Sequence, residues 1–429
     1  MTILSTLLAL APVLAGTSAN SGGLVAIKVG RAETAAKGVL EHAVILVDQG
    51  KIVEIGQDLP VERGIPVIDR PDWVVMPGLV NPYTRLGLES RSGSESSPEV
   101  SPTPEISPRH PDYRDVLEAG VTTLGIYPPG MGIPGHTAAI RPHGDSIAEM
   151  LLKEETYVKV YFRANAASKK LVKDAWGKVD EYDEKVKKAK EKWDKDNEKS
   201  KSKSSEKKEE PKPDAPKDEK KEEEKKDEKK DDKSKAFVPP EADAKVKPFL
   251  QVRDGKLGML VTLSQSADWL HWLDAIGERK FDYSVRVTMT RELDLFEVKE
   301  EIGKKGLRVV LEPEITLHPN TMRQRNIPME LSQAGAKVVL IPRNDTVTDH
   351  ENWLRNVGEM VAAGLDRQVA IKAVTLEAAA ALGLDKELGS LEKGKTANMV
   401  FYNGDPLEVG TQVQAVMLDG EFVFGEIDR

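Results

Sequence analysis

The sequence predicts an α/β protein in which a small sheet domain, built from both ends of the chain, flanks a larger domain of alternating strands and helices. Three observations support this prediction. Short apolar runs bounded by turns occur over 24–76 and again over 397–424. Between these regions, strand-like and helix-like segments alternate, which is typical of parallel βα units. A length of 429 residues is enough for one large α/β domain and a smaller one.

The two ends of the chain are predicted to pair into one small domain, with parts at 20–76 and 397–429. Asp48-Gln49-Gly50 and Asp419-Gly420 are typical of tight hairpin turns. Strands are expected on both sides of these turns, at 24–29, 43–47, 51–55, 397–402, 413–418 and 421–424.

The region 77–396 is predicted to form the larger domain. Residues 89–109 are rich in Ser, Pro and Glu, and we expect a long surface loop there. Strands are predicted at 121–127, 258–263, 283–288, 307–311 and 336–341. Helices are predicted at 112–119, 267–277, 293–303, 353–363 and 368–382.

A charged segment at 178–235 interrupts the alternation. Its first part, to about residue 197, has the composition of a charged helix. The remainder is Lys, Glu, Asp, Ser and Pro, and it has too few apolar residues to offset the entropy of ordering. We therefore predict a disordered insertion. It is either a docking arm for an unknown protein partner or a solvated spacer.

Residues 1–19 are predicted to be a signal peptide, which would place the protein in the periplasm or outside the cell. An apolar run over 3–15 precedes small and polar residues, and it is too short to span a bilayer. No Lys or Arg precedes the run, so a buried N-terminal helix is the alternative. No other stretch is long and apolar enough for a transmembrane span.

Composition excludes two classes of function. The net charge of −9 and the pI near 5.6 argue against a nucleic-acid-binding surface. The chain has no cysteine, so it has neither disulfides nor a thiolate metal site.

One stretch points to a known family. Val74-Val75-Met76-Pro77-Gly78-Leu79-Val80-Asn81-Pro82-Tyr83-Thr84-Arg85 resembles the VMPGLVDxHxH opening of the amidohydrolase superfamily. The sequence is also similar to imidazolonepropionase-like members at 50–56, 118–135, 334–345, 380–384, 389–400 and 404–406. The resemblance implies a (β/α)8 TIM-like barrel over 77–396 and a β-sandwich built from both termini.

The resemblance also implies a metal site at the carboxyl ends of the barrel strands. Family members bind one or two divalent metals, commonly zinc, through two histidines after the first strand, one after each of the fifth and sixth, and an aspartate after the eighth. The matching positions here hold Tyr83, Arg85, Thr262 and Thr288, so every histidine is replaced. Only Asp345 remains where the family has its catalytic aspartate. We therefore expect no metal cofactor.

Arg85 strengthens this expectation, because a guanidinium repels a nearby divalent cation and cannot lose its proton. We hypothesise that Arg85 pairs with Asp345 across the barrel mouth. The alternative is that the two side chains are solvated independently.

Other histidines are candidates for a relocated site. His136 and His143 flank a predicted strand and could reach the mouth together with Asp145. His318 and His350 lie in loops that follow predicted strands.

Two functions are therefore compatible with the sequence. The first is an exported, degenerate and metal-free amidohydrolase-fold protein that acts as a binding or assembly module. It could hold a small molecule at the barrel mouth and could form a homo-oligomer. The second is an active hydrolase of carbon–nitrogen bonds in non-peptide amides, cyclic amides or dipeptides, which would use Asp345 with a relocated or atypical site.

Overall fold

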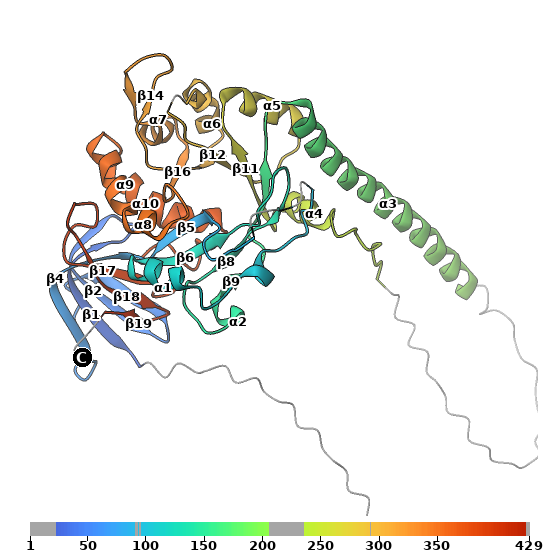
Figure 1. Cartoon of the computed structure of the whole chain (residues 1–429). Coiled ribbons are helices and arrows are strands. Elements are labelled where there is room, and N and C mark those ends of the chain that lie inside the picture. Colours follow the sequence, from blue (N-terminus) through green and yellow to red (C-terminus); the bar gives the residue numbers. More distant parts are fainter. Residues whose placement is uncertain (1–22, 91–92, 94–95, 206–235, 292, 426–429) are drawn as a thin grey trace, which may run out of the picture.

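The computed structural model describes residues 23–90, 93, 96–205, 236–291 and 293–425, without the side chains of 199–205 (Figure 1). The predicted signal peptide at 1–19 lies outside the described residues, as does the part of the predicted insertion at 206–235.

Strands from 25–77 and from 399–424 lie together in one seven-stranded sheet. Its strand order is β19-β18-β17-β4-β1-β2-β3. The two ends join where β4 pairs antiparallel with β17, so that Met76 lies opposite Val400. The strands are β1 (Val25–Glu33), β2 (Val39–Asp48), β3 (Lys51–Gln57), β4 (Val67–Pro77), β17 (Met399–Tyr402), β18 (Val413–Leu418) and β19 (Glu421–Phe424).

The two predicted hairpin turns have matching geometry. Gln49 and Gly50 both have positive φ angles, 46° and 76°, and Asp419 and Gly420 repeat this pattern at 47° and 78°. Two consecutive positive φ angles are the mark of a type I′ turn. A Cβ on Gly50 would lie 2.8 Å from the carbonyl oxygen of Asp419, so the two turns pack backbone against backbone.

Seven of the described strands pair in parallel within the larger domain. Neighbouring strands pair in parallel from β10 through β11, β12 and β13 to β16. The first two strands, β5 and β6, also pair in parallel but belong to a separate sheet. The strands are β5 (Leu79–Thr84), β6 (Val121–Ile126), β10 (Tyr157–Tyr161), β11 (Gly258–Leu263), β12 (Ser284–Val287), β13 (Arg308–Leu311) and β16 (Lys337–Leu340).

Short antiparallel strands occupy the edges at which these two sheets would join. The edge of β10 pairs with β7 (Gly135–His136), and the edge of β6 pairs with β8 (Ala138–Ile140), which in turn pairs with β9 (Leu151–Lys153). On the other side, α11 (Leu376–Ala381) contacts both β5 and β16. Hydrogen bonds among the described strands therefore do not close a barrel.

Helices cover the outer faces of the parallel strands (Figure 1). Two predicted helices are divided in the structure. The segment predicted at 293–303 is a 3₁₀ turn (Leu295–Val298) followed by α6 (Lys299–Lys304). The segment predicted at 368–382 breaks at Thr375, whose hydroxyl donates to the carbonyl of Ile371. The other helices are α1 (Pro111–Glu118), α2 (Ile147–Met150), α4 (Lys247–Arg253), α5 (Ser266–Ile276), α6 (Lys299–Lys304), α7 (Ile327–Gln333), α8 (Val347–Glu351), α9 (Trp353–Ala362) and α10 (Arg367–Val374).

Helix α3 (Ala166–Ser205) projects away from the domain as an arm (Figure 1). It begins before the predicted segment 178–197, because Val172 and Trp176 are buried and anchor its first turns. Farther out, the ring of Trp193 meets that of Phe237 on the returning chain edge to face, with centroids 5.9 Å apart. Neither this arm nor another helix of the described residues is long and apolar enough to cross a membrane.

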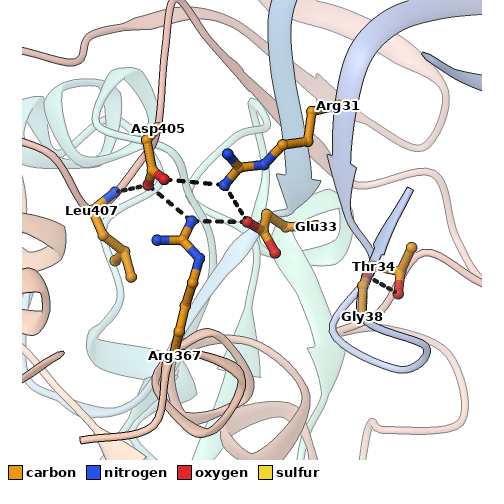
Figure 2. A network of polar contacts seen from close by, with 7 residues as sticks. All are labelled: Arg31, Glu33, Thr34, Gly38, Arg367, Asp405 and Leu407. Atoms are coloured by element: carbon orange, nitrogen blue, oxygen red, sulfur yellow. Dashed lines mark hydrogen bonds and ion pairs between the residues drawn. The ribbon is translucent and has the colours of Figure 1, made fainter. Parts of the chain in front are cut away.

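Four charged side chains connect the small sheet to the larger domain (Figure 2). On β1, the fully buried Glu33 accepts hydrogen bonds from Arg31 and from Arg367 at the start of α10. The same two arginines donate to Asp405, at 3.1 and 2.9 Å. Each guanidinium therefore bridges two carboxylates, and the network links β1, α10 and the turn after β17.

The inner faces of the parallel strands form a core of their own. Inward-facing side chains from five strands pack against Ala378, Ala379 and Leu382 of the α11 region: Val80, Tyr157, Leu260, Val310 and Val339. Alternate residues of a strand share a face. Lys159 is two positions after Tyr157, and Thr262 is two positions after Leu260. Both therefore point inward as well, and both lie nearer the carboxyl ends of their strands.

Candidate functional site

Asp345 lies at the carboxyl ends of the strands and is contacted by the last residue of β5 and by the residue that follows it. Thr84 donates its hydroxyl hydrogen to Asp345 Oδ1, with an oxygen–oxygen distance of 2.5 Å. Arg85 Nε lies 4.0 Å from Asp345 Oδ2, so the predicted pairing is present at the outer limit of an ion pair. The side chains of Arg85 and Asp345 are 40% and 35% exposed. Water therefore reaches this end of the strands, which we call the mouth.

Tyr83 packs beside this pair instead of facing water. Its ring stacks on that of Tyr127, which follows β6, with centroids 4.0 Å apart and planes inclined by 27°. Burial raises the pKa of both phenols, and for Tyr127 the neighbouring Tyr83 raises it further. Both rings therefore stay neutral at physiological pH and form an aromatic wall.

Lys159 of β10 lies against this wall. Its ammonium nitrogen is 3.8 Å from the ring centroid of Tyr127 and 5.5 Å from that of Tyr83, within the range of cation–π attraction. Only 4% of the residue is exposed. Burial lowers the pKa of Lys159 to about 7, and the positive charge of Arg85 acts in the same direction.

Arg286 of β12 supplies a third positive charge, 5.2 Å from the Tyr83 ring. It pairs with Glu312, which follows β13: Nη1 lies 3.1 Å from Oε2, and Nη2 contacts Oε1. Both side chains are largely buried, at 7% and 12% exposed. This ion pair is thus shielded from solvent, unlike that of Arg85 and Asp345.

The threonines at the two remaining family positions contribute no charge. Thr262 lies opposite Arg286 in the register of β11 and β12, and it is buried. Thr288 follows the end of β12, where its amide donates to the carbonyl of Leu263. The structure therefore brings Tyr83, Arg85, Thr262 and Asp345 to one end of the strands and places Thr288 just beyond Arg286.

His350 lies next to the mouth, and each of its two ring nitrogens has a hydrogen-bond partner. Its Nδ1 lies 2.7 Å from the carbonyl of Thr346, and its Nε2 lies 3.0 Å from Asn81 Nδ2. A carbonyl accepts and an amide nitrogen donates, so the ring is neutral with its hydrogen on Nδ1. Burial lowers the pKa of His350, which keeps it in this form. Asn81 Oδ1 in turn accepts from the amide of Tyr83 at 3.2 Å.

The other candidate histidines are separated. His136 is buried on β7 near the carbonyl of Pro98, whereas His143 and Asp145 are exposed. His318 lies 3.2 Å from Arg325 Nη1, at a hairpin after β13. Within the described ranges, no group of three or more His, Asp or Glu side chains is placed to hold a metal ion.

The donors at the mouth do not fit a divalent cation. The inward-facing positions near the strand ends hold Arg85, Lys159 and Arg286, which are cationic donors rather than electron-pair ligands. Asp345 already accepts from Thr84. A divalent site needs several oxygen or imidazole ligands, and one carboxylate does not provide them.

Four residues of the site were not predicted from the sequence: Tyr127, Lys159, Arg286 and Glu312. The sequence pattern nevertheless distinguishes two of them. Lys159 stands between valines in the strand pattern Tyr-Val-Lys-Val-Tyr, and Arg286 stands between Val285 and Val287. A charged residue between β-branched neighbours of a parallel strand must face inward or be paired, because both faces of such strands are covered.

A large hollow lies elsewhere. It has a volume of about 1300 Å³ and opens at the amino ends of the parallel strands, where Tyr157, Gly258, Ser284, Arg308 and Lys337 line it. In folds with parallel strands, ligands bind at the carboxyl ends. The mouth is therefore the candidate site.

Comparisons with known proteins agree with this architecture. Residues 352–424 match the model of the amidohydrolase family. The structure is similar to an amidohydrolase from Thermotoga maritima MSB8, with 18% identity, a TM-score of 0.72 and coverage of 94% of this chain and 100% of that chain. It is also similar to a prolidase complexed with N-methylphosphonate-L-proline (13% identity, TM-score 0.51, coverage 94% and 100%) and to a triazine hydrolase variant (14%, 0.50, 94% and 95%). No curated protein matches the sequence.

The protein is thus a mixed α/β protein with the fold of the amidohydrolases. The matched segment and the structural likeness confirm the resemblance to the amidohydrolase superfamily that the sequence predicted.

Proposed function

We propose that the protein is an exported, metal-free binding or assembly module built on the amidohydrolase fold. One observation carries this proposal: the inward-facing positions at the mouth hold three cations, Arg85, Lys159 and Arg286, and Arg85 stands where the family has a histidine. Two carboxylates, Asp345 and Glu312, are engaged by arginines of this set.

Coulomb's law indicates how strongly this arrangement opposes a metal. A guanidinium about 4 Å from a divalent cation is repelled by roughly 8 kcal/mol at an effective dielectric constant of about 20. Lys159, when protonated, adds to the repulsion. Asp345 cannot compensate for this alone, because Thr84 occupies one of its oxygens.

We also propose how the sheets correspond to the architecture of the amidohydrolases. The two sheets of parallel strands would derive from a (β/α)8 barrel whose ladder is interrupted by β7, β8 and β9. The seven-stranded sheet would correspond to the β-sandwich of the family. Export would depend on the apolar segment at 1–19. An unknown protein partner for the arm, and pairing of two copies of the chain, remain part of the proposal.

The second candidate function is hydrolysis of carbon–nitrogen bonds in amides, cyclic amides or dipeptides. It is favoured by the fold shared with a prolidase and a triazine hydrolase. Asp345 would then be the catalytic residue, because it is the one side chain kept at a catalytic position of the family.

Metal analysis combined with an activity assay separates the two functions. Protein purified in the presence of zinc is desalted, its metal content is measured, and N-acyl amino acids, cyclic amides and dipeptides are offered as substrates. We expect far less than one metal per chain and no turnover. About one metal per chain, together with turnover that is lost in Asp345→Asn and kept in the exposed control Asp282→Asn, would establish the hydrolase instead.

A further inference from the structure

The charges at the mouth do not balance. Three cations face the interior of the strands there, and two carboxylates oppose them, which leaves one positive charge without a partner. Arg286 pairs with Glu312, and Arg85 faces Asp345. Lys159 is the remaining cation. Within the described part of the chain, its ammonium group makes neither a hydrogen bond nor an ion pair; its contacts there are with the rings of Tyr83 and Tyr127.

An ammonium on a residue that is 4% exposed, without an anionic partner, is costly, because it has lost most of its contact with water without gaining an acceptor. Burial is the largest cause that lowers the pKa of Lys159 to about 7. The positive charges of Arg85, which follows β5, and Arg286 of β12 act in the same direction, whereas the negative charge of Asp345 after β16 opposes them.

Arg85 also has an unused donor. Its Nε is buried and has no hydrogen-bond partner, since 4.0 Å to Asp345 Oδ2 is too long for a hydrogen bond. Two cationic side chains from separate strands thus carry unsatisfied N–H groups at one end of the domain. The side chains of Arg85 and Asp345 are partly exposed, so a solute can approach this end of the domain.

We infer that the mouth binds a small organic monocarboxylate, with its carboxylate between Lys159 and Arg85 and its body against the wall of Tyr83 and Tyr127. This inference rests on the proposed metal-free function and names the class of ligand. A single negative charge neutralises the mouth, whereas a phosphate dianion would reverse its charge. The aromatic wall favours an acid with an apolar or aromatic body.

Protons are coupled to this binding. A carboxylate beside Lys159 favours the ammonium form and therefore raises its pKa in the complex. Below pH 7 the lysine is already charged, and affinity is independent of its titration. Above pH 7 binding takes up a proton, so affinity falls by up to about tenfold per pH unit.

Calorimetry with matched charged and neutral probes tests the inference. Benzoate and acetate are titrated into the full chain, alongside benzamide, acetamide and inorganic phosphate. We expect saturable binding of benzoate, weaker binding of acetate, and no binding of the amides. Phosphate should bind more weakly than benzoate. Equal binding of benzoate and benzamide, tighter binding of phosphate, or no binding of either carboxylate would overturn the inference.

Substitutions locate the site. Lys159→Met removes a buried charge and should fold well, and we expect benzoate to bind at least about tenfold more weakly. Lys159→Arg should retain binding and lose the dependence on pH above 7. Lys153→Met, on β9 beside Gly383, is the matched control and should bind as the unaltered protein does. Unchanged affinity in Lys159→Met would overturn the inference.

The outcome is separable from that of the metal analysis. A protein without metal or turnover that also ignores benzoate would refute the anion site and leave the binding-module proposal standing. A protein with one metal per chain would refute the binding-module proposal itself.

Discussion

Thr84 donates its hydroxyl hydrogen to Asp345 across the gap between β5 and β16, over an oxygen–oxygen distance of 2.5 Å. Thr84 is fully buried, and its oxygen also accepts from the amide of Leu86 at 3.1 Å. The hydroxyl therefore links β5 to the loop after β16, a strand to which β5 is not hydrogen-bonded. It fixes the carboxylate that the superfamily resemblance identifies as catalytic.

Thr84→Val is expected to lower the free energy of unfolding by about 1.5–3 kcal/mol, because it keeps the shape of the side chain and removes a hydrogen bond to a charged group. Denaturant unfolding monitored by tryptophan fluorescence measures the change. Thr84→Ser keeps the hydroxyl and should recover most of the loss. Equal stability of the two variants would show that the bond to Asp345 contributes little.

The pair of Arg286 and Glu312 should behave as a buried ion pair. Arg286→Met leaves Glu312 without its partner in a site that is 12% exposed, and we expect a loss of about 3–5 kcal/mol in unfolding free energy. The double variant Arg286→Met/Glu312→Gln removes the stranded charge and should regain much of that loss. Arg253→Met, which breaks the solvent-exposed pair with Asp183, is the control and should cost less than about 1 kcal/mol. A double variant no more stable than the single one would contradict this account.

The four-residue network of Figure 2 should govern the attachment of the small sheet. Glu33→Gln removes a fully buried charge that two arginines share, and we expect a loss of about 2–4 kcal/mol. Hydrogen exchange should rise in β1 and at the start of α10 before it rises in the parallel strands. Glu41→Gln on the exposed side of β2 should change neither quantity measurably. If hydrogen exchange in Glu33→Gln rises equally in both domains, the network does not specifically hold the small sheet to the larger domain.

His350 should make stability fall in mild acid. Burial lowers the pKa of His350 in the folded protein below its ordinary value near 6.5. The unfolded chain therefore binds the proton more readily, and the contribution is complete above pH 6.5 and is lost as the pH falls toward the folded pKa. Unfolding measured between pH 8 and 5 should show this slope.

The slope should be smaller in His350→Gln, which can still donate to Thr346 and accept from Asn81 without gaining charge. The exposed His143→Gln should keep the slope of the unaltered protein. If both variants retain the full slope, another group causes the loss of stability in acid.

Strands and turns were predictable because their local patterns are strong. Gln49-Gly50 and Asp419-Gly420 have the composition of type I′ turns, and the structure places both residues of each pair at positive φ. The strands at 258–263 and 413–418 were predicted with their observed bounds. The break at Thr375 was not predicted, because its cause is a hydroxyl bonded to the preceding turn within an otherwise helical sequence.

The candidate site was predictable only in part. Family positions pointed to Tyr83, Arg85 and Asp345, and charge alone suggested that the last two meet. The contact between Lys159 and Tyr127 could not be predicted from the sequence, because Lys159 lies on β10 and Tyr127 follows β6, two strands that belong to separate sheets. The sequence also did not predict that the described strands do not form a closed barrel, because this depends on β7 pairing with β10 and β8 pairing with β6.

The pairing of β4 with β17 has a consequence for synthesis in the cell. A ribosome makes the chain from its amino end, so β4 emerges with one partner, β1, and its other edge stays open until residues near Val400 are made. An open, apolar edge is a template for wrong pairing with a second chain. The edge contains Val74, Val75 and Met76, all buried in the finished sheet. Nascent chains of this protein are therefore expected to need protection at that strand until β17 has been made.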